Sequence, residues 1–220
     1  FPAVIGPPVA LTYHDVTPAK TVWFDCTPGE FRAQIDAMTR AGRVFVSVDM
    51  VAEALEGGRP LPKGAVCLTF ADNYRGFYVH AWPLLKKRRI PVAQFVHTGY
   101  VGSPVGRPKM SWTKLRELDR SGLVTIGSQT VSHPADLRSL SDAAVRREFA
   151  ASRARLEKEL GHPVRYLAYP NGKFDGRVAR LAQEAGYRLA FTERLSFLTS
   201  APSRWEVPRW VHTKWRTVIR

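Results

Sequence analysis

Short apolar runs alternate with helical patterns along the whole chain. The clearest run, residues 65–70, is apolar at consecutive positions, which is typical of a strand buried on both faces. Between two such runs, Phe31, Ile35 and Met38 recur at helical spacing, and Gly42 follows at the position that commonly ends a helix. The alternation continues to the C-terminal tail and therefore predicts parallel βα units.

The same pattern places the expected elements. Each expected strand is a short apolar run ended by polar or turn residues: 9–13, 44–48, 65–70, 92–97, 123–127, 166–169, 188–192 and a last one near 207–211. Each expected helix repeats apolar residues three and four positions apart: 30–41, 50–55, 77–89, 112–120, a long one after Ser141, and 178–185. We expect Ser111 and Ser141 to be N-caps and Pro83 to kink its helix. About seven strands in one domain, residues 1–220, predict a barrel or a doubly wound sheet.

The charge of the chain is strongly basic. Lys and Arg number 33 against 19 acids, which gives a net charge of +14. Such a charge fits a polyanion partner, such as nucleic acid, an anionic cell-wall polymer or a membrane surface. The densest run, residues 86–89, ends an expected helix, where the helix dipole favours cations. We therefore favour a solvated basic surface, expect no specific nucleic acid, and leave peripheral contact with an anionic envelope open.

Cysteines and leader segments narrow the class only slightly. Cys67 lies inside the apolar run 65–70 and is expected to be buried, whereas Cys26 lies in a loop. Two such residues do not make a disulfide framework. No run of about 18 apolar residues occurs, so we expect no membrane span. The chain begins at Phe1 with no recognisable leader, and its N-terminus does not indicate a compartment.

Polar side chains gather where the expected strands end. These positions are His14, Asp15, Asp72, Asn73, His97, Gln129, His133, Tyr169, Asn171, Thr192 and Glu193. Asp72 and His133 form a carboxylate and imidazole pair that fits Zn²⁺ or a similar ion. Gln129 and His133 are four residues apart, so one helical turn would place both on one face. An amide oxygen is a poor zinc ligand compared with imidazole.

Five segments together resemble a known family. Residues 11–16 (Leu-Thr-Tyr-His-Asp-Val), 69–74 (Thr-Phe-Ala-Asp-Asn-Tyr), 128–134 (Ser-Gln-Thr-Val-Ser-His-Pro), 165–172 (Arg-Tyr-Leu-Ala-Tyr-Pro-Asn-Gly) and 207–209 (Val-Pro-Arg) follow in order. They resemble the polysaccharide deacetylases with a NodB homology domain, carbohydrate esterase family 4. The last segment is similar to the extracellular branch, which includes poly-N-acetylglucosamine deacetylases. The resemblance implies a distorted (β/α) barrel, a monomer, an acetylated polysaccharide or cell-wall glycan as partner, and an extracellular, periplasmic or cell-envelope location.

The resemblance also implies a chemistry and its residues. Members of the family use a divalent metal to activate water against an acetamide or O-acetyl group. By resemblance Asp72 and His133 are metal ligands, and the backbone N–H of Tyr169 stabilises the oxyanion. The position of the general base is occupied by Ala71, and that of the first metal histidine by Gln129, which stays in our expected ligand set. Losing a general base typically lowers a rate by about 10²–10⁴, so we expect impaired activity.

Further roles are expected around this centre. His14 is expected to be catalytic, and His212 is a loose match for the family's late histidine, whose motif is absent. Tyr169, Trp112 and Trp210 are positioned to stack on sugars or to be ordinary rim aromatics. The residues expected to contact substrate are Tyr74, Arg165, Pro170 and Asn171.

Three classes of function remain open. The first is a metal-dependent deacetylase with a rearranged site, in which His14, Asp15 or His97 supplies the missing ligand or base. The second is a pseudoenzyme that keeps a glycan groove without hydrolysis, and the third is a basic polyanion-binding domain. Structural roles compete at each position, because Asp72 could cap a helix, Gln129 could be a satisfied buried amide, and His97 could be structural.

Overall fold

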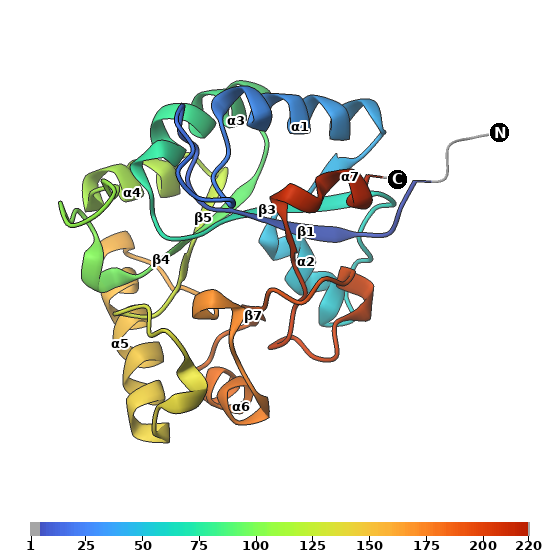
Figure 1. The fold of residues 1–220 in the computed structure, drawn as a ribbon. Helices are drawn as coiled ribbons and strands as arrows, with labels where there is room; N and C mark the ends of the chain where they lie inside the picture. The colour runs from blue at the N-terminus through green and yellow to red at the C-terminus, as the bar shows by residue number, and fades with distance from the viewer. Residues whose placement is uncertain (1–4, 220) are drawn as a thin grey trace.

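The strands form one sheet in which every pairing is parallel. The computed structural model describes residues 5–219, and the strand order is β7-β6-β5-β4-β3-β1-β8, with β2 paired to β3 off this path (Figure 1). The strands are β1 (Val9–Tyr13), β2 (Val44–Phe45), β3 (Ala65–Phe70), β4 (Val92–Val96), β5 (Val124–Ser128), β6 (Tyr166–Ala168), β7 (Leu189–Phe191) and β8 (Trp210–Val211). An isolated parallel bridge joins Phe191 of β7 to Val207, shortly before β8. The predicted distorted barrel is confirmed.

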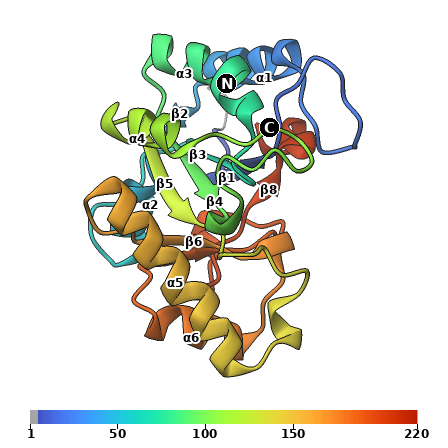
Figure 2. The same cartoon turned by 90° about the vertical axis from the view of Figure 1, so that its left-hand side faces the viewer.

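Helices cover the outside of this sheet. They are α1 (Pro28–Arg40), α2 (Val48–Leu55), α3 (Trp82–Arg88), α4 (Trp112–Arg120), α5 (Asp142–Leu160), α6 (Gly176–Glu184) and α7 (Trp215–Val218). Figure 2 shows α1 and α3 at the opposite end of the molecule from α5 and α6, with the strands between them. The predicted caps are confirmed, because Ser111 and Ser141 each accept a backbone N–H of the first turn and Gly42 has a φ of 76°. No helix of residues 5–219 is long and apolar enough to cross a bilayer.

Two expected elements differ from the structure. The strand expected over 44–48 contains two residues only, because the Ser47 side chain caps α2 and Val48 already begins that helix. The helix expected over 77–89 consists of a π-helix, Phe77–Ala81, followed by α3. Pro83 is the second residue of α3, which directly follows this π-helix in one unbroken helical segment. The Trp82 N–H donates to the Phe77 carbonyl five residues back, so the helix is distorted where the proline enters it.

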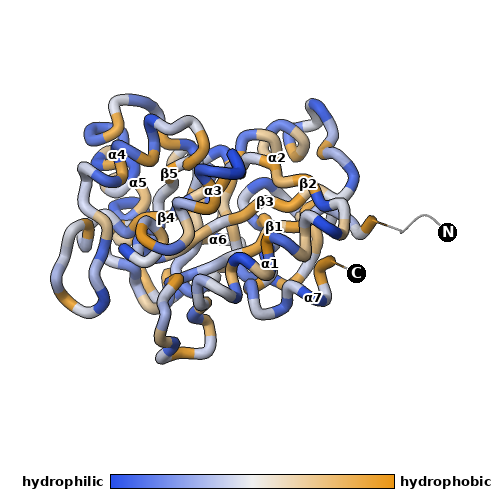
Figure 3. The backbone as a smooth tube through the Cα atoms, turned by 90° about the horizontal axis from the view of Figure 1, so that it is seen from above, coloured by the Kyte–Doolittle hydropathy of each residue, from blue (hydrophilic) through white to orange (hydrophobic). Residues whose placement is uncertain are grey.

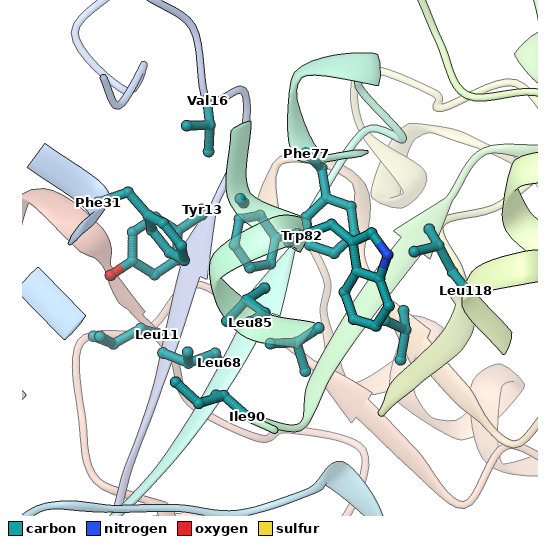
Figure 4. Packing of buried hydrophobic residues seen from close by; sticks show 14 of the residues in the cluster. Leu11, Tyr13, Val16, Phe31, Leu68, Phe77, Trp82, Leu85, Ile90 and Leu118 are labelled. Atoms are coloured by element: carbon teal, nitrogen blue, oxygen red, sulfur yellow. The ribbon is translucent and has the colours of Figure 1, made fainter. Parts of the chain in front are cut away.

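The strands are buried on both faces, as the continuous apolar runs predicted. Alternate residues of β3, such as Val66 and Leu68, pack with β1 against α1 and α3 (Figure 4). The intervening residues, including Cys67, pack with Phe95 and Phe191 in a second cluster. The tube in Figure 3 is correspondingly apolar along β1 and β3. Both cysteines are free and buried, which confirms the prediction for Cys67.

Candidate active site

Two neighbouring cavities open at the C-terminal ends of the strands. We call the first the Tyr74 cavity; it measures about 290 Å³ and is lined by Asp72, Tyr74, His97, Tyr100, Val105, Lys109, Ser132 and His133. We call the second the His14 cavity; it measures about 350 Å³ and is lined by His14, Trp23, Phe24, Asp72, Gln129, His133, Asn171, Glu193, Leu195 and Val211. Asp72 and His133 line both cavities and so lie at the boundary between them.

Asp72 and His133 contact each other directly. His133 Nε2 lies 3.3 Å from Asp72 Oδ1, which is longer than an ordinary charge-assisted hydrogen bond. Asp72 Oδ1 is buried, and within residues 5–219 it accepts no hydrogen bond of ordinary geometry, so the long contact with His133 leaves it under-satisfied. Burial alone would raise the pKa of Asp72, but the imidazoles of His133, His14 and His97 lower it to about 2. The carboxylate is therefore ionised, and an under-satisfied buried oxygen leaves it open to a cation.

The backbone around this pair is held in an unusual conformation. Asp72, Asn73, Thr130 and His133 have φ values of 71°, 55°, 71° and 51°, a left-handed region that residues other than glycine rarely adopt. Side chains hold the turns in place, because Thr130 Oγ1 accepts the His133 N–H and Asn73 Nδ2 donates to the Met110 carbonyl. Four such residues in two facing loops are typical of a functional site.

Gln129 is a structural link in this geometry. Its Oε1 accepts the backbone N–H of Asp72 at 2.9 Å, and its side chain is buried. The loop from Gln129 to His133 is not helical, so the expected shared helical face is wrong. The amide therefore joins the loop after β5 to the loop after β3, as the buried-amide alternative expects.

Ala71 continues the pairing of β1 with β3. Its side chain is buried, and its N–H donates to the Tyr13 carbonyl at 2.8 Å. Tyr13 is the register partner of Phe70, so His14 is the next residue beside Ala71. His14 Nδ1 is buried without a hydrogen-bond partner in the described chain, and its ring lies 4.8 Å from that of Phe24. Burial lowers the pKa of His14 against the opposing effects of the Asp72 and Glu193 carboxylates.

The expected oxyanion donor is already used. The Tyr169 N–H donates to the Phe191 carbonyl at 3.0 Å, which continues the pairing of β6 with β7. The Tyr169 hydroxyl donates to the Trp205 carbonyl, and its side chain is buried. The expectation that the Tyr169 N–H faces a substrate oxyanion is therefore wrong for this structure.

The expected substrate residues are divided. Tyr74 and Asn171 line the two cavities, although Asn171 Nδ2 donates to the Ala135 carbonyl. Pro170, which precedes Asn171 in the chain, is buried. Arg165 lies before β6, in a separate cavity with His162 at the opposite ends of the strands. Its expected contact with substrate at this site is wrong, because a strand separates it from both cavities.

One exposed aromatic side chain at the site, Trp23, was missed in the sequence. Trp112 packs under Arg155 and Trp210 packs near Phe197, and neither lines the two cavities. Trp23 is 70% exposed and lines the His14 cavity. Its signal was the apolar run 22–24 inside an otherwise polar loop.

That loop is held over the site by Arg107. Its guanidinium donates to Asp25 Oδ2 at 2.8 Å, to Asp15 Oδ2 at 3.0 Å and to the Thr21 hydroxyl. Arg107 comes from the segment 99–110, which also pairs with the strand end after Asp72 through the bridge between Tyr74 and Lys109. Asp15 contacts Arg107 and lines neither cavity.

Two further histidines are buried near the site. His212 stacks on Tyr13 at 4.9 Å and lines neither cavity, in agreement with a structural role. His97 lines the Tyr74 cavity, and its ring centroid lies 5.4 Å from that of His133. Burial lowers the pKa of both imidazoles to about 4.

A metal fits this site in part. Within residues 5–219 no group of three or more His, Cys, Asp or Glu side chains is placed to hold an ion. Asp72 and His133 offer two donors of the right chemistry, and the under-satisfied Oδ1 of Asp72 favours a cation. Gln129, the expected third ligand, has its oxygen engaged by the Asp72 N–H.

Comparison with known proteins identifies the class. A family model described as polysaccharide deacetylase matches residues 58–190, more than half of the chain. The chain therefore belongs to the polysaccharide deacetylase family, whose members are generally metal-dependent.

The relatives point to one branch. The chain is 26% identical, over 91% of its length, to a poly-β-1,6-N-acetyl-D-glucosamine N-deacetylase of Escherichia coli K12, of which it covers 36%. It is 25% identical to the Staphylococcus aureus protein of the same name, covering 84% of this chain and 67% of that one. The chain thus spans about a third of the Escherichia coli relative and two thirds of the Staphylococcus aureus one.

Solved structures agree with the fold. The structure of IcaB from Ammonifex degensii superposes with a TM-score of 0.87 at 30% identity, covering 97% of this chain and 96% of that one. The Streptococcus pyogenes deacetylase PplD, in complex with acetate, superposes with a TM-score of 0.83 at 25% identity, covering 94% and 92%. The fold of the chain thus follows the architecture of these proteins.

Proposed function

We propose that the chain removes N-acetyl groups from a poly-N-acetylglucosamine-type polysaccharide with the help of a divalent metal. The observation that carries this proposal is the Asp72–His133 pair, which lies at the boundary of two cavities at the strand ends of a deacetylase barrel. The names of the curated relatives support the amide of N-acetylglucosamine as the bond that is cut.

The chain's own residues have distinct tasks in this proposal. Asp72 and His133 would hold the metal, which when bound polarises the acetyl carbonyl and acidifies a water molecule. Ala71 has no group that can move a proton. His14 lies beside it, directly after β1, and its Nδ1 is buried with no hydrogen-bond partner in the described residues. An imidazole can accept and donate protons near neutral pH. We therefore assign proton transfer to His14.

Two other features complete the site. Because the Tyr169 N–H is used within the sheet, we assign stabilisation of the oxyanion to the next backbone N–H after Pro170, that of Asn171 in the His14 cavity. The exposed Trp23 at the same cavity offers an apolar face for a sugar ring. The resemblance to the extracellular branch of the family also supports a location: the chain would act on its polysaccharide outside the cytoplasm, in the periplasm or at the cell envelope. It would do so as a monomer.

A glycan-binding pseudoenzyme is the second candidate. Ala71 and Gln129 favour it, because one leaves no base at the family's position and the other engages its amide in a structural bond. Such a protein would use the same cavities to bind an acetylated glycan without cutting it.

Acetate release separates the two candidates. Oligomers of β-1,6-linked N-acetylglucosamine are incubated with protein that has been treated with a chelator and then supplied with Zn²⁺, Co²⁺ or Ni²⁺. Metal-stimulated acetate release that is absent in Asp72→Asn supports the deacetylase. Oligomer binding by wild-type protein without any acetate release would overturn it in favour of the pseudoenzyme. The basic-domain alternative predicts instead that binding falls steeply with salt.

A further inference from the structure

His97 lies beside the position at which the family's metal histidine is missing. In the parallel pairing of β4 with β5, Val96 is the register partner of Ser128, and the Gln129 N–H donates to the Val96 carbonyl at 2.8 Å. His97 is therefore the next residue beside Gln129, one strand away. Paired strands are roughly 4.8 Å apart, so the side chains at the two positions start about one strand spacing from each other.

The surroundings of His97 suit a ligand. The side chain is 6% exposed and lines the Tyr74 cavity together with Asp72 and His133. Its Nδ1 is buried and has no hydrogen-bond partner in the described part of the chain. A buried polar nitrogen in that state is costly unless a partner arrives, and a metal ion is such a partner.

The spacing of the two imidazoles also fits a shared ion. Zinc–nitrogen bonds of 2.0–2.1 Å at a tetrahedral angle place two imidazole centroids roughly 5 Å apart. The centroids of His97 and His133 are 5.4 Å apart. Two loop bonds set this spacing, because the Thr98 and Gly99 N–H groups donate to the Thr130 and Val131 carbonyls at 3.1 Å and 2.9 Å.

We propose that His97 is the third protein ligand of the metal, with Asp72 and His133, and that it replaces the histidine lost at Gln129. This proposal rests on the proposed function and names the donor set of the same site. Within residues 5–219 the three donors are not placed to converge on one point, so the proposal requires the His97 ring to turn towards the ion. Gln129 then acts as a positioning residue, because its bond to the Asp72 N–H fixes the loop that carries the carboxylate.

His14 is the competing imidazole. It also has a buried, unpartnered Nδ1, but it lies at the end of β1 and lines the His14 cavity. His97 directly follows β4, which lies between β3 and β5, the strands that precede Asp72 and His133. Three donors from adjacent strand ends can approach one ion from one side, which leaves the opposite side open to water and substrate.

Metal affinity tests the proposal without reference to catalysis. Binding of Co²⁺ and Zn²⁺ to purified protein is measured by competition with a chromophoric chelator for wild-type, His97→Ala, His14→Ala and His162→Ala. We expect affinity to fall at least tenfold in His97→Ala and to stay within about twofold in the other two variants. His162 is the matched control, because it lies at the opposite strand ends in contact with Asp119.

A second variant tests whether His97 takes the place of a histidine at position 129. Adding Gln129→His to His97→Ala returns an imidazole to the family's position, and we expect it to recover most of the lost affinity. Wild-type affinity in His97→Ala, or loss of affinity in His14→Ala alone, would overturn the proposal.

A measurement on the unaltered chain covers the case in which His97→Ala fails to fold. The Co²⁺ protein should show two paramagnetically shifted, exchangeable imidazole N–H resonances, one from each coordinated histidine. A single resonance would refute the role of His97 and leave the proposed function standing. Failure of wild-type protein to bind Co²⁺ or Zn²⁺ at micromolar concentration would refute both.

Discussion

The two sides of the site differ in what stands at the positions to which the resemblance assigns catalytic roles. On the side of β1 and β3, Ala71 stands at the position assigned to the base, its N–H donates to the Tyr13 carbonyl, and His14 lies beside it. On the side of β4 and β5, Gln129 stands at the position assigned to a metal histidine, its amide oxygen accepts the Asp72 N–H, and His97 lies beside it. The Ala71 side chain thus makes no hydrogen bond in place of a base, whereas Gln129 makes a structural bond in place of a metal ligand. Ala71→Asp should therefore break no existing hydrogen bond, whereas Gln129→His should break the bond to the Asp72 N–H.

The largest expected effect comes from the residue that both sides share. Asp72→Asn removes the charge from the boundary of the two cavities while keeping a residue that tolerates a φ of 71°. Losing the metal's polarising effect removes several kcal/mol of transition-state stabilisation, about 10³-fold or more in rate. Acetate release should fall to background and Co²⁺ affinity should drop, as measured by steady-state assay and chelator competition. Retained activity would show that Asp72 does not hold the metal.

The next effect isolates the side of β1 and β3. His14→Gln should lower kcat by about 10²–10⁴ with little change in metal affinity, because it removes the proposed proton carrier alone. Kinetic assay beside metal titration separates the two effects. The double variant His14→Gln with Ala71→Asp should recover part of kcat. No recovery would mean that a side chain at position 71 cannot take over the proton transfer assigned to His14.

Restoring both family residues should produce a gain. Ala71→Asp alone should raise kcat without a change in metal affinity, whereas Ala71→Asp with Gln129→His should raise both. Gln129→His should also lower the free energy of unfolding by roughly 1–3 kcal/mol, because the Asp72 N–H loses its acceptor. Acetate release, chelator competition and urea denaturation measure the three quantities. No gain in kcat or affinity would show that the groove has diverged beyond these two positions.

A smaller effect concerns the bond that joins the loops over the two sides. Arg107 links the segment 99–110, after β4, to Asp15 and Asp25, after β1. Arg107→Met should lower the free energy of unfolding by roughly 2–3 kcal/mol, because it removes charged hydrogen bonds from the buried Asp25 carboxylate. Urea denaturation measures the change, with the exposed, neighbouring Arg75→Met as control. An equal decrease in the free energy of unfolding of Arg75→Met would show that the bonds of Arg107 have no special effect on stability.

The smallest effect is a loss of stability in acid. Burial would raise the pKa of Asp25, but hydrogen bonds from Arg107 and from the Thr21 and Val22 N–H groups lower it to about 2. A carboxyl with a lowered pKa stabilises the fold above its ordinary value of 3.8 and loses this contribution as the pH falls towards 2. About 2 kcal/mol should disappear over that range. In Asp25→Asn the loss of stability over this pH range should be smaller by about that amount, as measured by denaturation at several pH values, while the share of other carboxyls with lowered pKa values, such as Asp72, remains.

The sequence predicted local structure well where one residue decides it. The run 65–70 is β3 with the same bounds, Ser111 and Ser141 are caps, and Gly42 ends α1. The strand predicted over 44–48 was wrong at Ser47 and Val48, because the apolar run there fits a strand as well as the start of a helix. The capping bond of Ser47 stabilises the helix.

The sequence predicted which residues lie at the site better than it predicted which hydrogen bonds they make. Asp72 and His133 were paired from strand ends alone, and the structure brings them into contact. The use of the Tyr169 N–H by Phe191 depends on which strand lies beside which, and a linear pattern does not contain this order. Trp23 was missed because a loop residue has no periodicity to mark it.

The parallel register has a consequence for how such proteins evolve. A site above a sheet can be reached from two strands whose residues are distant in the sequence: His97 and Gln129 lie side by side although 31 residues separate them in the chain. A new side chain can arise on one strand while the old one is still present on the other, so the original can be lost without an inactive intermediate. Classifying a family member as active or inactive therefore requires its neighbouring strands as well as its aligned motif.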